Sequence, residues 1–175
     1  MGRASVKPDK NIYFRSREKL ELSREKASSL LEAIEPDRLE RIENEKSLPR
    51  PEEVLIMSER YKAPELRNYY CTHDCPIGIK YMEQVQVKDL SQIVLETIAS
   101  LNRLDEDKAR LVEITVDGQI DDDELKDFAK IQNELETISA TVEALKLWGD
   151  QMIAAGKINV DRLEQYRIMA KSKKK

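Results

Sequence analysis

Residues 22–46, LSREKASSLLEAIEPDRLERIENEK, decide how the N-terminal half of this chain folds. Ser23 is a good N-cap for a short helix, because its hydroxyl can accept a hydrogen bond from the first turn. Pro36 suits the first position of a second helix, since its φ is already helical and it has no N–H to leave unpaired. Leu39 and Ile42 point inward from that second helix. The stretch therefore predicts two short helices joined by a tight turn, the second with a charged outer face.

The flanking sequence predicts three further short helices in the same block. One covers about residues 11–20, a second starts at Pro51 with two carboxylates in its first turn, and a third starts at Pro64. We expect the inward side chains of the last two helices to be Val54, Leu55, Met57, Ser58 and Tyr61, then Leu66, Tyr69 and Tyr70. The segment Cys71–Gly78 breaks the periodic pattern and is expected to close this first domain, over residues 11–75.

The C-terminal half has the pattern of a helical hairpin, which we place with a short terminal helix in a domain over residues 84–170. A long helix over 87–116 is expected to end at Gly118, and a second long helix to begin at Asp121. The expected inner stripe of the first helix is Leu90, Val94, Ile98, Leu101, Leu104, Lys108 and Leu111. The second helix carries a heptad seam typical of a coiled coil, made of Phe128, Ile131, Leu135, Ile138, Val142, Leu145 and Met152. The terminal helix is expected over 160–170, and residues 1–10 and 171–175 are expected to be flexible tails.

Composition narrows the class of protein. Charged residues make up 37 % of the chain and aromatic residues 5 %, a balance that favours an all-α fold with solvated outer faces.

No run of apolar residues is long enough to span a membrane, and the N-terminus lacks the apolar core of a secretory signal, so we expect a cytoplasmic protein without a membrane partner. Lys and Arg balance Asp and Glu at 15 each over residues 1–75, whereas residues 76–175 are acidic, with 15 against 19. An acidic C-terminal half favours self-association or protein partners over nucleic acid.

Two short helices with a charged second helix are the layout of a helix-turn-helix, whose second helix enters the major groove of DNA. Over about residues 11–75 the chain resembles the Xre-type, or phage lambda repressor-like, helix-turn-helix family. The residues that carry the resemblance are Leu22-Ser23-Arg24-Glu25, Ala27, Leu31, Arg41-Ile42-Glu43-Asn44, Lys46 and Pro49 or Pro51. The chain departs from the family pattern at two places: the turn Glu32–Ile34 is one residue longer and lacks Gly, and Glu45 stands where Gly normally follows Asn44.

The resemblance implies a DNA-binding site and a five-helix domain. Arg24 stands where the family has a DNA-contacting residue at the start of its second helix. The exposed face of the recognition helix would then consist of Pro36, Asp37, Arg38 and Arg41. On that face Arg41 would bind guanine through two hydrogen bonds, and Asp37 would accept one from N4 of cytosine. Asn44 and Lys46 would approach phosphates. The alternative interpretation is that these charges form only the solvated face of a small helix, which also carries several carboxylates.

Cys71, His73 and Cys75 are side chains of the kind that bind zinc. A closed structural site needs four ligands, and these three are the only Cys and His residues of the chain, so a fourth would have to come from Asp74 or another molecule. We favour a reduced pair of cysteines without metal. No metal and no other cofactor is therefore expected.

The chain has no nucleophile–base pair and no glycine-rich phosphate loop, so we expect no enzymatic activity. The sequence predicts a sequence-specific DNA-binding regulator of transcription, repressor-like and dimeric through its C-terminal helices. Its partners would be double-stranded DNA and a second copy of the chain. The alternative is a protein-interaction adaptor that uses a helix-turn-helix fold without DNA, because a fold does not fix a function.

Overall fold

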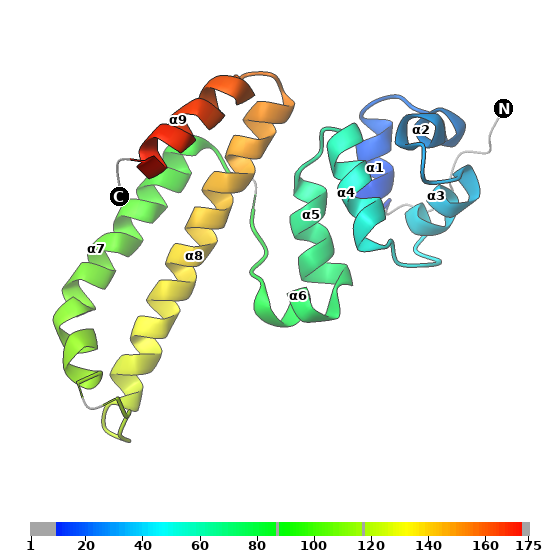
Figure 1. The fold of residues 1–175 in the computed structure, drawn as a ribbon. Helices are drawn as coiled ribbons and strands as arrows, with labels where there is room; N and C mark the ends of the chain where they lie inside the picture. The colour runs from blue at the N-terminus through cyan, green and yellow to red at the C-terminus, as the bar shows by residue number, and fades with distance from the viewer. Residues whose placement is uncertain (1–9, 87, 117, 173–175) are drawn as a thin grey trace. The chain divides into compact units, whose positions relative to one another are not determined.

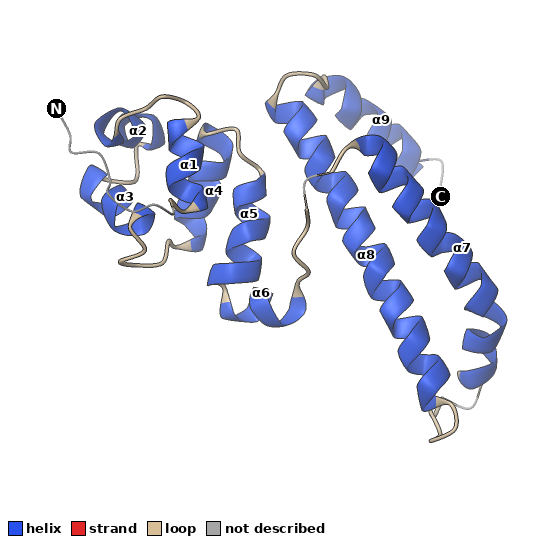
Figure 2. Ribbon diagram, turned by 180° about the vertical axis from the view of Figure 1, so that it is seen from behind, coloured by secondary structure: helices blue, strands red, loops and turns tan. Residues whose placement is uncertain are grey.

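The computed structural model describes residues 10–86, 88–116 and 118–172, and in these ranges the chain is all-α, with no strand (Figures 1 and 2). The helices are α1 (Ile12–Glu18), α2 (Arg24–Leu31), α3 (Pro36–Glu43), α4 (Pro51–Arg60), α5 (Glu65–Tyr69), α6 (Pro76–Tyr81), α7 (Leu90–Ile114), α8 (Leu125–Ala154) and α9 (Val160–Ser172), with a π-helical turn, η1 (Tyr70–Asp74), between α5 and α6. In the described part of the chain, no helix combines the length and the apolar character needed to cross a bilayer.

Local signals fix where several helices begin. The Ser23 hydroxyl accepts a hydrogen bond from the backbone N–H of Lys26 at 3.3 Å, as the predicted N-cap requires. The carboxylate of Asp89 accepts one from Gln92 N–H at 3.0 Å in the same way. Pro36 and Pro51 occupy the first positions of α3 and α4. The starts predicted at these prolines and at Ser23 are therefore confirmed.

By its contacts the described chain divides into two units, the first comprising the residues up to Glu83 together with those from Asp150 onward, and the second Gln84–Gly149. The first unit has a core formed by residues of α1 to α5 and of the links between them. Its buried side chains are Tyr13, Ala27, Leu31, Ile34, Leu39, Ile42, Val54, Met57, Tyr61, Ala63 and Leu66. Leu55, expected to point inward from α4, is half exposed, whereas Leu66 is fully buried as predicted.

The segment Cys71–Gly78, predicted to interrupt the helical pattern, is largely helical. The chain continues from α5 into η1, where the N–H of Cys75 donates to the carbonyl of Tyr70, five residues earlier, and α6 then starts at Pro76. A Cβ at Gly78 would lie 2.0 Å from the carbonyl oxygen of Cys71, so glycine allows α6 to pack against η1. The prediction failed because this close approach depends on tertiary contact and leaves no periodic signal.

In the second unit, α7 and α8 lie side by side and run antiparallel. Three ion pairs join them: Arg103 to Glu134 at 2.8 Å, Asp107 to Lys130 at 2.7 Å and Arg110 to Asp127 at 2.6 Å. Residue numbers rise on one helix as they fall on the other, which is the signature of antiparallel neighbours. α8 begins at Leu125, four residues later than predicted, and before it the N–H of Asp121 donates to the Glu124 carboxylate.

Only part of each expected apolar stripe of α7 and α8 is buried, which corrects the prediction that these stripes form the inner sides of the two helices. Leu90, Val94, Ile98, Leu101 and Lys108 of α7 are exposed, as are Leu135, Val142 and Leu145 of α8. Leu104, Leu111, Phe128, Ile138 and Met152 are partly buried, and Ile131 is fully buried. The physical reason is that the buried side of each helix also takes in small polar residues, Ser100 on α7 and Thr141 on α8, which a purely apolar pattern leaves out.

Some predicted positions lie outside the described residues. These are residues 1–9 of the predicted N-terminal tail, Val87 at the predicted start of the long helix, Asp117, and residues 173–175 of the predicted C-terminal tail. Lys171 and Ser172, also assigned to that tail, belong to α9.

Candidate nucleic-acid interface

Helices α2 and α3 form the candidate interface, and the four residues between them make a tight link without glycine. Glu32, which caps the end of α2, has a φ of +61°, and Glu45, just after α3, has a φ of +58°. These are left-handed conformations that glycine adopts without a steric penalty. At both places where the sequence lacks the expected glycine, a glutamate takes up a left-handed φ.

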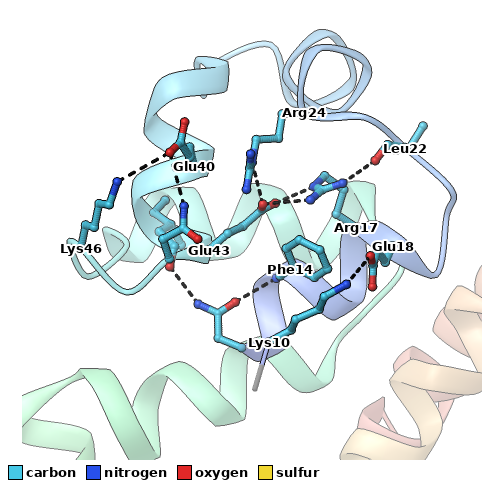
Figure 3. Close-up of polar contacts among 12 residues, drawn as sticks. Lys10, Phe14, Arg17, Glu18, Leu22, Arg24, Glu40, Glu43 and Lys46 are labelled. Atoms are coloured by element: carbon cyan, nitrogen blue, oxygen red, sulfur yellow. Dashed lines mark hydrogen bonds and ion pairs between the residues drawn. The ribbon is translucent and has the colours of Figure 1, made fainter. Parts of the chain in front are cut away.

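A buried carboxylate fixes α3 to the two helices before it (Figure 3). Glu43, with a side chain only 1 % exposed, accepts hydrogen bonds from Arg17 Nε at 2.5 Å and Nη2 at 2.9 Å, and from Arg24 Nε at 2.9 Å. Arg17 also donates to the carbonyl oxygen of Leu22. The hydrogen bonds to Glu43 raise the pKa of Arg17 further above its ordinary value. One ionic cluster therefore joins α1, the start of α2 and the end of α3.

A second guanidinium fixes α3 to α4. Arg38 donates to both carboxylate oxygens of Glu53, at 2.8 and 2.7 Å, to the Ser47 hydroxyl at 2.7 Å and to the carbonyl oxygen of Leu48 at 2.9 Å. Glu53 also accepts from the backbone N–H of Arg50 at 2.6 Å. Burial by itself would raise the pKa of Glu53. The hydrogen bonds from Arg38 and Arg50 together have a larger effect in the opposite direction, so the pKa of Glu53 lies below its ordinary value. Arg38 thus holds the loop after α3 against α4.

The outer side of α3 carries Asp37 and Arg41, both exposed, with Pro36 half buried at its start. The guanidinium of Arg41 makes no hydrogen bond or ion pair with any residue that the structure describes. At the end of α3, Glu40 lies near the Lys46 ammonium at 3.6 Å and accepts a long hydrogen bond from Asn44 at 3.4 Å (Figure 3). The structure thus leaves Arg41 open to solvent, whereas Arg24 and Arg38 have carboxylate partners.

The ion pair of Arg17 with Glu43 was not predicted from the sequence. A signal for Glu43 was present, because it lies four residues after Leu39 and so shares the inner side of α3 with it. A carboxylate on a buried side requires a partner, since an unpaired buried charge is very costly. Its partner was not predictable, because Arg17 lies 26 residues earlier and only the packing of α1 on α3 brings the two together.

The possible zinc ligands lie at η1 and the start of α6. His73 is exposed and stacks on the Tyr69 ring, with ring centroids 4.1 Å apart, and its Nδ1 lies 3.0 Å from the carbonyl oxygen of Tyr69. Burial, and then the nearby Cys75, raise the pKa of the Cys71 thiol, which disfavours the thiolate that metals bind. In the part of the chain that the structure describes, no three His, Cys, Asp or Glu side chains are grouped so as to hold a metal ion.

Asp74, the possible fourth zinc ligand, makes a different contact. Its carboxylate accepts a hydrogen bond from the Tyr13 hydroxyl at 2.6 Å, which ties α1 to η1. Burial, and then this bond, raise the pKa of Tyr13, so the phenol stays protonated and remains a donor.

Comparisons with known proteins give no further lead. No protein-family model matches the chain. The curated proteins and the solved structures likewise include no match to it.

Proposed function

We propose that this protein is a sequence-specific regulator of transcription that binds double-stranded DNA as a repressor-like homodimer. In this proposal α1 to α5 form a lambda repressor-like domain, with α2 and α3 as its helix-turn-helix. Helices α7 and α8 form a hairpin through which two copies associate.

The observation that carries the proposal is the contrast between the two sides of α3. Its inner side is fixed by Glu43 to α1 and α2, and Arg38 fixes the loop after it to α4. Its outer side leaves Arg41 unpaired within the described chain, beside the exposed Asp37. A base-reading helix needs this combination, because a side chain can select one base only if the helix that carries it is held still.

Two roles follow for the basic residues. Arg41 is the proposed reader of guanine, and Lys46 with Asn44 the proposed contacts to phosphate. Arg24 and Arg38 position α3 through their carboxylate partners and contact DNA only at the edge of the interface. The ion pairs with Glu43 and Glu53, and not contacts with bases, set the orientation of the two guanidinium groups and of their remaining N–H donors.

The alternative function is a protein-interaction adaptor built on the same fold. The balanced charge of residues 1–75 favours it, since most DNA-binding surfaces are basic. The exposed carboxylates Asp37 on α3 and Glu25 on α2 also favour the adaptor, since carboxylates repel phosphate. The two functions differ in one measurable property, which is affinity for duplex DNA.

Selection from a library of random duplexes at low salt, followed by fluorescence anisotropy with the enriched sequence, tests the proposal. We expect Arg41→Ala to weaken binding by about 1–3 kcal/mol, or roughly 5- to 150-fold, and to relax preference at one base pair. Arg162→Ala on α9 removes the same charge from an exposed site and serves as the control. A wild-type chain that enriches no sequence would favour the adaptor.

A further inference from the structure

Cys71 and Cys75 are the only cysteines of the chain, and both are free and partly exposed. Cys71 lies in η1, and Cys75 caps the end of η1 and the start of α6. Side chains four residues apart on a helix are neighbours, with about 5–6 Å between their Cβ atoms. Burial, and then Cys75 itself, raise the pKa of the Cys71 thiol, as expected of two close thiols. The two cysteines therefore lie next to each other at a π-helical turn, a feature that is frequent at functional sites.

A disulfide between these two thiols is within reach but is not preformed. It needs Cα atoms about 4.4–6.8 Å apart, which one helical turn supplies, and Cβ atoms about 3.5–4.5 Å apart, which is closer than helical spacing gives. Closure therefore requires the backbone to move by about 1–2 Å. A disulfide that holds the backbone away from its relaxed position is more easily reduced. The pair is thus suited to reversible oxidation and not to permanent cross-linking.

The packing around the two cysteines favours movement of Cys75 over movement of Cys71. A Cβ at Gly78 would collide with the carbonyl group of Cys71, so α6 lies directly against the backbone of Cys71. Cys75 has an extended backbone, with φ of −93° and ψ of 117°, and its N–H donates to the carbonyl oxygen of Tyr70 at 2.9 Å. Its dihedral angles can change without a break inside a helix. The residue directly before it, Asp74, moves with it.

Asp74 connects the cysteine pair to α1. Its carboxylate accepts a hydrogen bond from the Tyr13 hydroxyl at 2.6 Å, and Tyr13 is 3 % exposed in the core of the first unit. A displacement of about 1–2 Å takes such a contact beyond hydrogen-bond distance. The redox state of the two cysteines is thereby coupled to α1, which also holds α3 through Arg17 and Glu43.

We propose that Cys71 and Cys75 form a redox switch, in which a low-molecular-weight disulfide oxidises them to an intrachain disulfide and Asp74 is released from Tyr13. The inference goes beyond the proposed function, and it holds for a DNA-binding regulator and for an adaptor alike.

The oxidation takes place by two exchange steps. The thiolate of one cysteine attacks the small disulfide, RSSR, which forms a mixed disulfide and expels RS⁻. The thiolate of the other cysteine then attacks the protein sulfur of the mixed disulfide and expels the second RS⁻. The two protons of the cysteine thiols end on the two RS⁻ groups, so one RSSR is reduced to two RSH while the two thiols are oxidised to one disulfide. An excess of RSH reverses both steps.

Intact-protein mass spectrometry of the full chain tests the proposal, after equilibration in mixtures of reduced and oxidised glutathione and quenching with acid. We expect the wild type to lose the mass of two hydrogen atoms and to take up no glutathione as the oxidised fraction rises. Cys71→Ser and Cys75→Ser cannot close, so each should carry one glutathione on its remaining thiol. A wild-type chain that stays reduced, or that carries glutathione instead of closing, would overturn the proposal.

Urea unfolding of Tyr13→Phe in both redox states tests the link to α1. Relative to the wild type, this variant should lower the midpoint of the reduced chain, and that of the oxidised chain by less than half as much, because closure has already removed the bond. Tyr61→Phe deletes a buried hydroxyl that has no partner among the described residues, and its effect should be the same in both states. A Tyr13→Phe effect that is equal in the two states would contradict the release of Asp74.

Discussion

Glu43 shows how much of the first unit depends on one carboxylate. It is almost fully buried and accepts hydrogen bonds from Arg17 and Arg24, so its removal leaves the buried Arg17 without a counter-charge. We expect Glu43→Ala to lower the free energy of unfolding by about 3–5 kcal/mol, because a buried charge that loses its partner is strongly destabilising. Urea unfolding followed by circular dichroism measures this change.

Tyr61 provides the control for Glu43, because it is buried in the same core. Its hydroxyl has no hydrogen-bond partner among the described residues, and burial raises its pKa. Tyr61→Phe removes an unsatisfied polar atom and should leave stability unchanged or slightly higher. If Glu43→Ala is no more destabilising than Tyr61→Phe, the ionic cluster does not hold α3 in place.

Glu53 makes the stability of the first unit depend on pH. Its folded pKa lies below its ordinary value of 4.5, so its contribution to stability is complete above about pH 4.5 and is lost as the pH falls through the folded pKa. We expect the difference in melting temperature between the wild type and Glu53→Gln to shrink between pH 5 and pH 3. The exposed Glu52→Gln is the charge-matched control. A difference that stays constant over this range would mean that the Arg38–Glu53 contact does not stabilise the fold.

At the level of helices, two glycines should respond in opposite ways to alanine. A Cβ at Gly78 would meet the backbone of Cys71, which cannot easily move, so Gly78→Ala should destabilise the packing of α6 on η1 by about 1–3 kcal/mol. Gly149 lies in α8 with open space around it, and Gly149→Ala should stabilise that helix by about 0.5–1 kcal/mol. Thermal unfolding by circular dichroism compares both variants with the wild type. Equal effects at the two sites would contradict this description of the glycines.

The helices differ in how far the sequence predicts them. The starts of α2, α3 and α4 depend on Ser23, Pro36 and Pro51, whose effects act within one turn of the chain and are therefore visible in the sequence. The rotation of α7 and α8 was not predictable, because apolar and charged side chains both recur at spacings of three and four residues on these helices. The packing of the two helices decides which side faces inward, and it buries Ser100 and Thr141, which the apolar pattern does not contain.

The candidate interface also has some features that the sequence predicts and others that it does not. The exposure of Arg41 on α3 follows from helical spacing and could be predicted, whereas the role proposed for it in reading DNA stays a prediction. The partners of Arg24 and Arg38 could not be predicted, because Glu43 and Glu53 lie 19 and 15 residues away along the chain. Ion pairs between helices depend on how the helices pack, and that information is spread over the whole core.

For the molecule as a whole, the contrast between its units predicts two unfolding transitions. The first unit has a cluster of buried apolar residues, whereas the helices of the second depend on the proposed contact with another copy. Trp148, the only tryptophan of the chain, lies in the second unit, so its fluorescence reports on that unit. We expect the fluorescence midpoint in urea to rise with protein concentration, because association stabilises only the folded form.

Far-UV circular dichroism of the same samples supplies the comparison, since it averages over both units. It should show an additional transition whose midpoint does not change with concentration. Coincident transitions at every concentration would mean that the described chain unfolds as one body and that the second unit needs no partner.

The ion pairs between α7 and α8 also constrain how this sequence can change over evolution. Arg103 faces Glu134 and Lys130 faces Asp107, so each position is tied to one on the other helix. A change of sign at one of them places two like charges opposite each other unless its counterpart changes sign as well. Among descendants of this chain, an acidic residue at 103 should therefore be inherited together with a basic residue at 134, whereas Asp105 and Lys108, which pair with each other on α7, place no such constraint on α8.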